Sequence, residues 1–167
     1  TEKVYINVYS TSKWITPLMI AILNNNIEIA ELLLKDKRTN INSRNCNNQT
    51  ALTISVEQKL EKIVSLIINN ERFNPKESSI DYAFYISTGS ISNLLLSVKD
   101  VDINYQYPYN KPIQGNDRGR FRFMSYSSNS GIFDAYSYET PLMKAVKTRD
   151  IEKIKLLIEQ PSLNNDK

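Results

Sequence analysis

Four segments of the chain share one pattern of apolar and polar positions. Each opens on Thr or Ser, has Leu or Ile two residues later and a small residue five residues later, and ends in an apolar run. The segments span residues 16–34, 50–68, 78–96 and 140–158. The small residues are Ala21, Ser55, Ala83 and Ala145, and eleven residues after each of them stands Leu32, Leu66, Leu94 or Leu156. Four matches in register indicate an internal repeat.

Each segment has the pattern of two short antiparallel helices. Thr16 and Thr140 suit the N-cap position, and each is followed by a proline at the first helical position, where its missing N–H costs nothing. A polar break at residues 24–26 separates the first helix from a second one that carries Ile29, Ala30, Leu32 and Leu33. The second helix of the last segment carries Ile154, Leu157 and Ile158. Neither helix of a pair can cover its own apolar face, so we expect the pairs to stack side by side.

The connection between the first two segments, residues 40–49, begins with Ile and Asn and continues with turn-forming residues, which predicts an extended stretch and a tight turn. With the TPLxxA opening and a spacing of 34 residues from Thr16 to Thr50, the chain resembles the ankyrin repeat family. The resemblance implies an all-α, ankyrin-type solenoid of about four stacked helix-turn-helix repeats with β-turn fingers. The family's His is replaced by Met19, Thr53, Asp81 and Met143, so its hydrogen bonds between neighbouring turns are expected to be absent.

The spacing of the segments predicts one domain, residues 1–167, with one long insertion. From Ile41 to Thr50 is 9 residues, from Phe73 to Ser78 is 5, and from Ile103 to Thr140 is 37. The second finger is therefore expected to be a tight connection. The predicted parts are a partial strand or cap at 1–13, repeats at about 14–47, 48–76, 77–104 and 138–167, and an insertion at about 105–139. The two ends of the chain resemble either parts of a longer array or minimal caps. The third segment is expected to be the least regular of the four.

Composition excludes several classes of function. The chain has no His, one Cys and a net charge of +3, so Ser-His or Cys-His nucleophiles, most metal sites and a strongly basic nucleic-acid binder are not expected. No apolar run approaches the roughly 18–20 residues of a membrane span. We therefore expect no enzyme, no cofactor and no metal, and the lone thiol fits a cytoplasmic or other intracellular location.

The insertion is rich in Tyr, Phe and Arg, the side chains enriched at binding hot spots. One interpretation makes it a partner-contacting surface; the other has its aromatic rings fold back over helix ends of the third and fourth repeats. A third makes it a single-stranded nucleic-acid binder, through rings that stack on bases and arginines that pair with phosphates. A protruding hairpin is predicted at the Arg-Phe-Arg-Phe alternation. The side chains that would form the partner-contacting surface are Tyr105, Tyr107, Tyr109, Arg118, Arg120, Phe121, Arg122, Phe123, Tyr126, Tyr136 and Tyr138.

The resemblance implies a second surface, because ankyrin arrays usually bind proteins with their fingertips and the exposed side of their first helices. The matching positions are Lys13, Ile15, Leu23, Asn24, Cys46, Asn47, Gln49, Glu57, Gln58, Lys147 and Thr148. Trp14 lies next to the first fingertip, and the sequence leaves open whether it packs or anchors a partner. The sequence therefore predicts a non-catalytic protein–protein interaction module of unknown partner.

Overall fold

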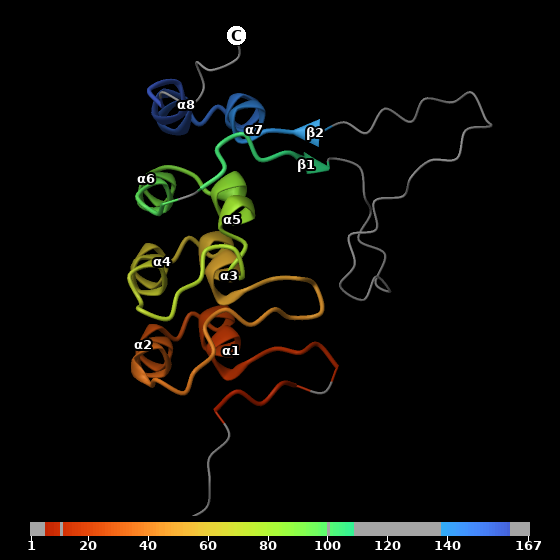
Figure 1. The fold of residues 1–167 in the computed structure, drawn as a ribbon, viewed down its shortest axis with the longest axis vertical. Coiled ribbons are helices and arrows are strands. Elements are labelled where there is room, and N and C mark those ends of the chain that lie inside the picture. Colours follow the sequence, from red (N-terminus) through yellow and green to blue (C-terminus); the bar gives the residue numbers. More distant parts are fainter. Residues whose placement is uncertain (1–5, 11, 100, 109–137, 161–167) are drawn as a thin grey trace, which may run out of the picture.

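The computed structural model describes residues 6–10, 12–99, 101–108 and 138–160. In these ranges the chain forms helices in consecutive pairs and one short strand ladder (Figure 1). The first helices are α1 (Pro17–Leu23), α3 (Ala51–Glu57), α5 (Ile80–Ile86) and α7 (Pro141–Thr148). The second helices are α2 (Ile27–Lys35), α4 (Glu61–Ile68), α6 (Ser90–Leu96) and α8 (Ile151–Ile158). The ladder joins β1 (Tyr107–Pro108) to β2 (Tyr138–Glu139).

The first helices begin where the sequence predicts. The Thr16 hydroxyl accepts the Met19 N–H at 3.3 Å, and Thr140 accepts the Met143 N–H at the same distance, each with proline opening the helix. α5 differs from the expected pattern, because its N-cap is Ser79 rather than Ser78, has the left-handed φ of 57° and makes no side-chain cap bond. The third segment is therefore the least regular at its start, as its missing Thr-Pro predicts.

The pairs lie side by side along the long axis, with the first helices in one row and the second helices in another (Figure 1). Each first helix contacts the next first helix, and each second helix contacts the next second helix. The recurring small residues Ala21, Ser55, Ala83 and Ala145 are all buried. A small side chain at this position lets neighbouring helices approach closely, as the sequence predicts.

The recurring leucines are not the most deeply buried residues of their helices, and Leu94 and Leu156 are half-buried. Leu32 is 67 % exposed and Leu66 is 38 % exposed. The next residue in three of the pairs, Ile67, Leu95 and Leu157, is fully buried. A helix turns by about 100° per residue, so neighbouring positions in an apolar run face different sides and the run alone does not identify the core position.

The helix pairs also differ in how their first helix ends. In the first pair the Asn25 N–H donates to Ile22 O and the following N–H to Ala21 O, with Asn25 in the left-handed region at φ 53°, which is a Schellman end. The first helices of the second and fourth pairs, α3 and α7, end in the same way, with Lys59 and Arg149 in the left-handed region. In the third pair Ser87 is extended, and this end is not formed.

Lys153, on α8, satisfies the carbonyl groups at that end of α5. Its side chain is 2 % exposed, and its Nζ donates to the carbonyl oxygens of Phe84, Tyr85 (3.3 Å) and Ser87 (2.8 Å). The equivalent residues of the second and third pairs are Ile63 and Ile91, which are buried apolar residues. A basic side chain of the fourth pair thus replaces the helix end that the third pair lacks.

The pKa of Lys153 is lowered to about 7, chiefly by burial and also by the positive charge of Lys144, while the carboxylate of Asp150 acts in the opposite direction. The unfolded chain keeps this amine protonated up to about pH 10.4, so between these pH values folding releases a proton. We therefore expect the free energy of unfolding to rise from about pH 7 to pH 9, by at most about 1.4 kcal/mol per pH unit. Urea unfolding across this range measures the slope. Replacing Lys153 by Met should flatten it, and an equal slope in the variant would assign the proton to another group.

Two of the three connections follow the predicted fingers. Arg44 and Thr50 form an isolated antiparallel bridge across the turn, and Asn48 takes the left-handed φ of 60° that its place in the turn requires. The second connection is a tight turn in which the Ser78 N–H donates to Asn74 O, as its short length predicts. The third opens with the β1–β2 ladder at the root of the insertion, and the hairpin predicted within the insertion lies outside the described residues.

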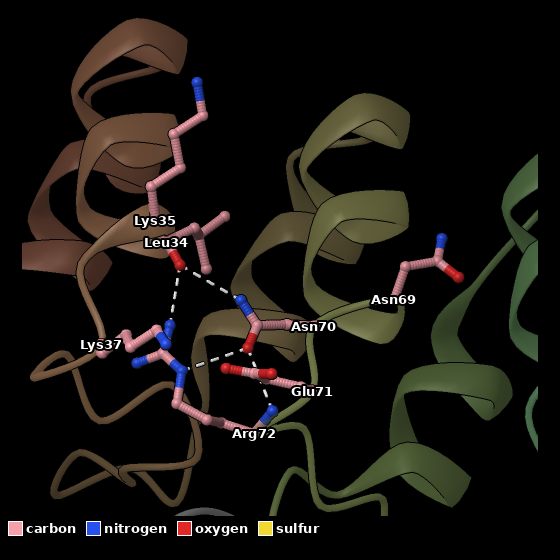
Figure 2. A pocket seen from close by; sticks show the side chains of 7 residues that line it. All are labelled: Leu34, Lys35, Lys37, Asn69, Asn70, Glu71 and Arg72. Atoms are coloured by element: carbon pink, nitrogen blue, oxygen red, sulfur yellow. Dashed lines mark hydrogen bonds between the residues drawn. The ribbon is translucent and has the colours of Figure 1, made fainter.

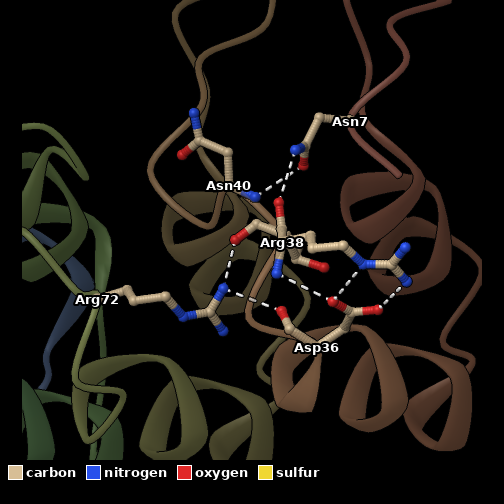
Figure 3. Close-up of polar contacts among 6 residues, drawn as sticks. Asn7, Asp36, Arg38, Asn40 and Arg72 are labelled. Carbon is tan, nitrogen blue, oxygen red and sulfur yellow. Dashed lines mark hydrogen bonds and ion pairs between the residues drawn. The ribbon is translucent and has the colours of Figure 1, made fainter. Parts of the chain in front are cut away.

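Asparagine side chains make bonds between neighbouring connections. Asn7 Nδ2 donates to the Arg38 carbonyl (2.7 Å), and Asn7 Oδ1 accepts the N–H two residues further on (2.7 Å; Figure 3). Asn42 repeats both bonds with the Arg72 carbonyl (2.8 Å) and the N–H two residues after it (3.1 Å). The missing His therefore does not leave neighbouring connections unbonded, because the Asn of the recurring Ile-Asn pair connects them.

Candidate binding surface

Most of the family-implied residues that the structure describes are exposed. Gln49, Ile15 and Tyr107 are half-buried, and the exposed ones are Lys13, Leu23, Asn24, Cys46, Asn47, Glu57, Gln58, Lys147 and Thr148. They belong to the finger connections and to the C-terminal parts of α1, α3 and α7. The stacking of the first helices in one row brings these elements to one side of the molecule (Figure 1).

Of the remaining insertion residues, Tyr105 is half-buried and Tyr138 is exposed, and the others lie outside the described residues. They are Tyr109, Arg118, Arg120, Phe121, Arg122, Phe123, Tyr126 and Tyr136. Partner binding by the insertion and its nucleic-acid alternative both depend on these side chains, so both remain predictions.

Hydrogen bonds fix the first two fingers relative to each other and to α3. The Cys46 N–H donates to Lys13 O at 3.1 Å, which joins the two fingertips. Gln49 Nε2 donates to Glu57 Oε2 at 2.9 Å, which joins the second finger to the end of α3. Burial raises the pKa of Glu57, and the bond from Gln49 opposes that change. The polar groups on this side of the molecule are therefore held in place before any partner binds.

Three tyrosine rings join the root of the insertion to α5. The Tyr107 ring of β1 stacks on Tyr85 at 4.9 Å and on Tyr82 at 5.2 Å between ring centroids. Burial raises the pKa of Tyr82 to about 12 and raises that of Tyr85 as well. Tyr107 thus packs against a helix of the third pair, which is the contact expected if the aromatic rings of the insertion fold back.

Glu139, at the other side of the root, is a buried carboxylate with two partners. The Tyr85 hydroxyl donates to its Oε2 at 2.5 Å, and Lys147 Nζ lies 2.6 Å from its Oε1. Burial alone raises the pKa of Glu139, but the bonds from Lys147 and Tyr85 outweigh it, so the pKa is lowered. The Nζ of Lys144 lies 4.2 Å from the Tyr85 ring centroid, and its pKa is lowered chiefly by burial. These contacts join α5, α7 and β2 into one polar and aromatic cluster.

Tyr82 and Lys144 are half-buried at this surface and Tyr85 is buried beneath it, and the sequence did not predict any of the three as site residues. In the repeat register Tyr85 corresponds to Leu23, Glu57 and Lys147, all of which were predicted site residues. Carrying the register through the irregular third segment would have found it. Glu139 gave no comparable signal, because its burial depends on the ladder at the root of the insertion.

A cavity of about 360 Å³ lies elsewhere, between the C-terminal ends of α2 and α4 (Figure 2). It is lined by Leu34, Lys35, Lys37, Asn69, Asn70, Glu71 and Arg72. Arg72 Nη2 and Asn70 Nδ2 both donate to the Leu34 carbonyl, at 2.7 and 3.1 Å. Within this lining, Arg72 and Asn70 are therefore engaged in completing the end of α2.

The described residues contain neither a candidate metal site nor a helix that could span a membrane. None of their His, Cys, Asp and Glu side chains gather into a group that could hold a metal ion. None of their helices combines the length and apolar character needed to cross a membrane.

Comparison with known proteins identifies the repeat. Residues 3–78 match the family model described as ankyrin repeats (3 copies). A segment of 55 residues is 40% identical to alpha-latrotoxin-Lg1a of Latrodectus geometricus, and it covers 32% of this chain but 4% of that protein. No solved structure matches the chain. The resemblance to the ankyrin repeat family is therefore confirmed over residues 3–78.

Proposed function

We propose that the chain is a non-catalytic protein-recognition module built as one solenoid of four ankyrin-type repeats. The repeats correspond to about residues 14–47, 48–76, 77–104 and 138–167, with a cap or partial strand before them and an insertion at about 105–139. The partner binds the fingers and the exposed ends of the first helices. Ankyrin repeats are generally protein–protein interaction modules, and the cytoplasm or another intracellular compartment is the proposed location.

The arrangement of the predicted side chains carries the proposal. Exposed residues from two fingers and three first helices lie on one side of the stack, on elements that pack against one another. Bonds such as Gln49 to Glu57 hold this side in a fixed form. A rigid surface loses little conformational entropy when a partner binds, which favours affinity. The tyrosine and lysine cluster of α5 and α7 extends the same surface to the root of the insertion.

Two matched triple variants test the binding face. The first replaces the exposed Leu23, Asn47 and Gln58 by Ser; the control replaces Leu32, Asn93 and Lys155, exposed residues of the second helices. Both should keep the helical circular dichroism spectrum of the parent chain. Proteins captured by the parent from an extract of the source organism are quantified by mass spectrometry. We expect the first variant to lose recovery of the specific partners at least tenfold, which corresponds to about 1.4 kcal/mol.

The control variant should recover those partners as the parent does. Equal recovery by both variants would place binding away from the fingers and first helices. Recovery that falls only in the control variant would assign it to the second helices. If nuclease treatment of the extract removes all captured proteins, nucleic acid is the direct ligand and the proposal fails.

A further inference from the structure

Trp14 adopts a backbone conformation that its side chain does not favour. Its φ is 53°, in the left-handed region, and its N–H donates to Ser10 O at 3.1 Å to close the first finger. In L-residues this region brings the β-carbon too close to the following carbonyl oxygen, and only Gly, Asn and Asp adopt it readily. A tryptophan at this point therefore strains the turn.

The second finger shows what the same turn position ordinarily takes. Asn48 lies 34 residues after Trp14, has φ 60°, and its N–H donates to Asn45 O at 2.9 Å. The Asn48 N–H bonds three residues back and the Trp14 N–H four residues back, but both residues share the left-handed φ. Asn tolerates this region, so the second finger adopts it with less strain. Nothing in the geometry of the turn requires an aromatic ring at residue 14.

Burial does not offset this strain. The Trp14 side chain is 58 % exposed, and the neighbouring Val8 and Tyr9 are 56 % and 45 % exposed. Residues held in a strained conformation with little packing gain are concentrated at ligand-binding sites. Tryptophan is also among the residues most enriched at binding hot spots. The fold gains little from Trp14, whereas a partner that covers the ring would gain a large apolar contact.

The charges around Trp14 indicate which partner would fit. Lys13 is exposed beside it, and Arg44 is half-buried in the second finger. The sequence has no Asp or Glu between residues 8 and 16 or between 42 and 50, so the charged side chains of the two fingers themselves are positive. The carboxylate beside them is Glu57 at the end of α3, which accepts a hydrogen bond from Gln49. The bond from the Cys46 N–H to Lys13 O holds the two fingertips together as one surface. Such a surface complements carboxylates.

We propose that Trp14 anchors a docking surface, formed by the first two fingers, for a protein segment that carries an apolar side chain next to acidic residues. This rests on the proposed function and specifies its partner. The exposed apolar side chains of Val8 and Tyr9 favour a peptide, whose side chain can pack among them, over a nucleic acid.

The variant Trp14→Asn tests the strain and the binding together, because it gives the first finger the residue of the second. We expect its melting temperature to rise by about 2–4 °C, since the turn is relaxed and little burial is lost. A random peptide-display library is selected on the full chain, and the enriched peptides are synthesised. We expect them to be acidic with an apolar residue, and to bind Trp14→Asn at least tenfold more weakly than the parent chain. Trp14 is the chain's one tryptophan, so its fluorescence should shift to shorter wavelength as each peptide is added to the parent.

The outcomes separate this inference from the proposed function. Enriched peptides that bind Trp14→Asn and the parent equally, and lose affinity in the Leu23, Asn47 and Gln58 variant, would support the module but overturn Trp14 as its anchor. A lower melting temperature of Trp14→Asn would show that the ring packs, and would overturn the inference. Enrichment of basic peptides, or no enrichment, would also overturn it. A single-stranded oligonucleotide that competes with the acidic peptides at equal concentration would identify nucleic acid as the ligand instead.

Discussion

Replacing Lys153 by Met should lower the free energy of unfolding by about 2–4 kcal/mol near pH 10.4, where folding no longer has to remove a proton from this amine, because the buried carbonyl groups at the end of α5 lose a donor. The methionine fills most of the same space, so the loss is polar rather than a cavity effect. The carbonyl oxygens of Phe84, Tyr85 and Ser87 would remain buried at the end of α5 with no donor from α8. Urea unfolding followed by circular dichroism gives the free energy.

Lys155→Met provides the matched control, because Lys155 is exposed and lies two residues further on the same helix. It should change stability little. A loss in Lys153→Met no greater than in Lys155→Met would mean that the end of α5 is satisfied without Lys153. The structural account of the third helix pair would then be wrong.

Replacing Arg72 by Met should also lower the free energy of unfolding by about 2–4 kcal/mol, since its guanidinium completes the end of α2. Arg72 Nη1 donates to the carbonyls of Asp36 (3.0 Å) and Thr39 (2.5 Å), and Nη2 donates to Leu34 (2.7 Å) (Figures 2 and 3). One side chain from the second connection therefore donates to three backbone carbonyls of the first helix pair, and Asn70 Nδ2 also donates to the Leu34 carbonyl. Chemical unfolding of both proteins under the same conditions measures the difference.

Arg38→Met is the control, because Arg38 lies 34 residues before Arg72 in the repeat register. Its guanidinium pairs with Asp36 at 2.5 Å on the surface, where its side chain is 63% exposed. This pairing holds the pKa of Asp36 at about 2, through the hydrogen bonds from Arg38. Exposed ion pairs contribute little to stability, so Arg38→Met should unfold close to the parent. Equal losses in the two variants would contradict the role given to Arg72.

The sequence was sufficient to predict the features that depend on residues close together in the chain. Thr16 and Thr140 cap their helices through residues three positions away, and Asn48 takes the left-handed turn within its own finger. The third segment lacked the Thr-Pro opening, and its irregular start follows from that. Such features depend on neighbours in the chain, so the order of residues reveals them.

Contacts between distant parts of the chain were not predictable in the same way. Lys153 and Phe84 are 69 residues apart, and Arg72 and Leu34 are 38 apart. In sequence, Lys153 occupies an apolar position of the repeat and looks like an ordinary charged substitution. All four segments keep a leucine at the position of Leu32, yet Leu32 is exposed while Leu34 of the same helix is buried.

The binding surface was predictable where the repeat register was regular. The predicted residues of the first, second and fourth pairs are exposed or half-buried on the expected elements, whereas Tyr82 and Tyr85 of the irregular third pair were overlooked. The sequence left the role of Trp14 open, and its strained φ and its exposure argue for contact with a partner.

The basic side chains that finish α2 and α5 both come from later in the chain, and this gives the array a direction. Arg72 emerges after α4 and reaches back to α2, and Lys153 reaches from α8 back to α5. During synthesis, these two helices would leave the ribosome before the groups that complete them. The first and the third helix pair would then become fully stable only after the pair that follows each of them has been made.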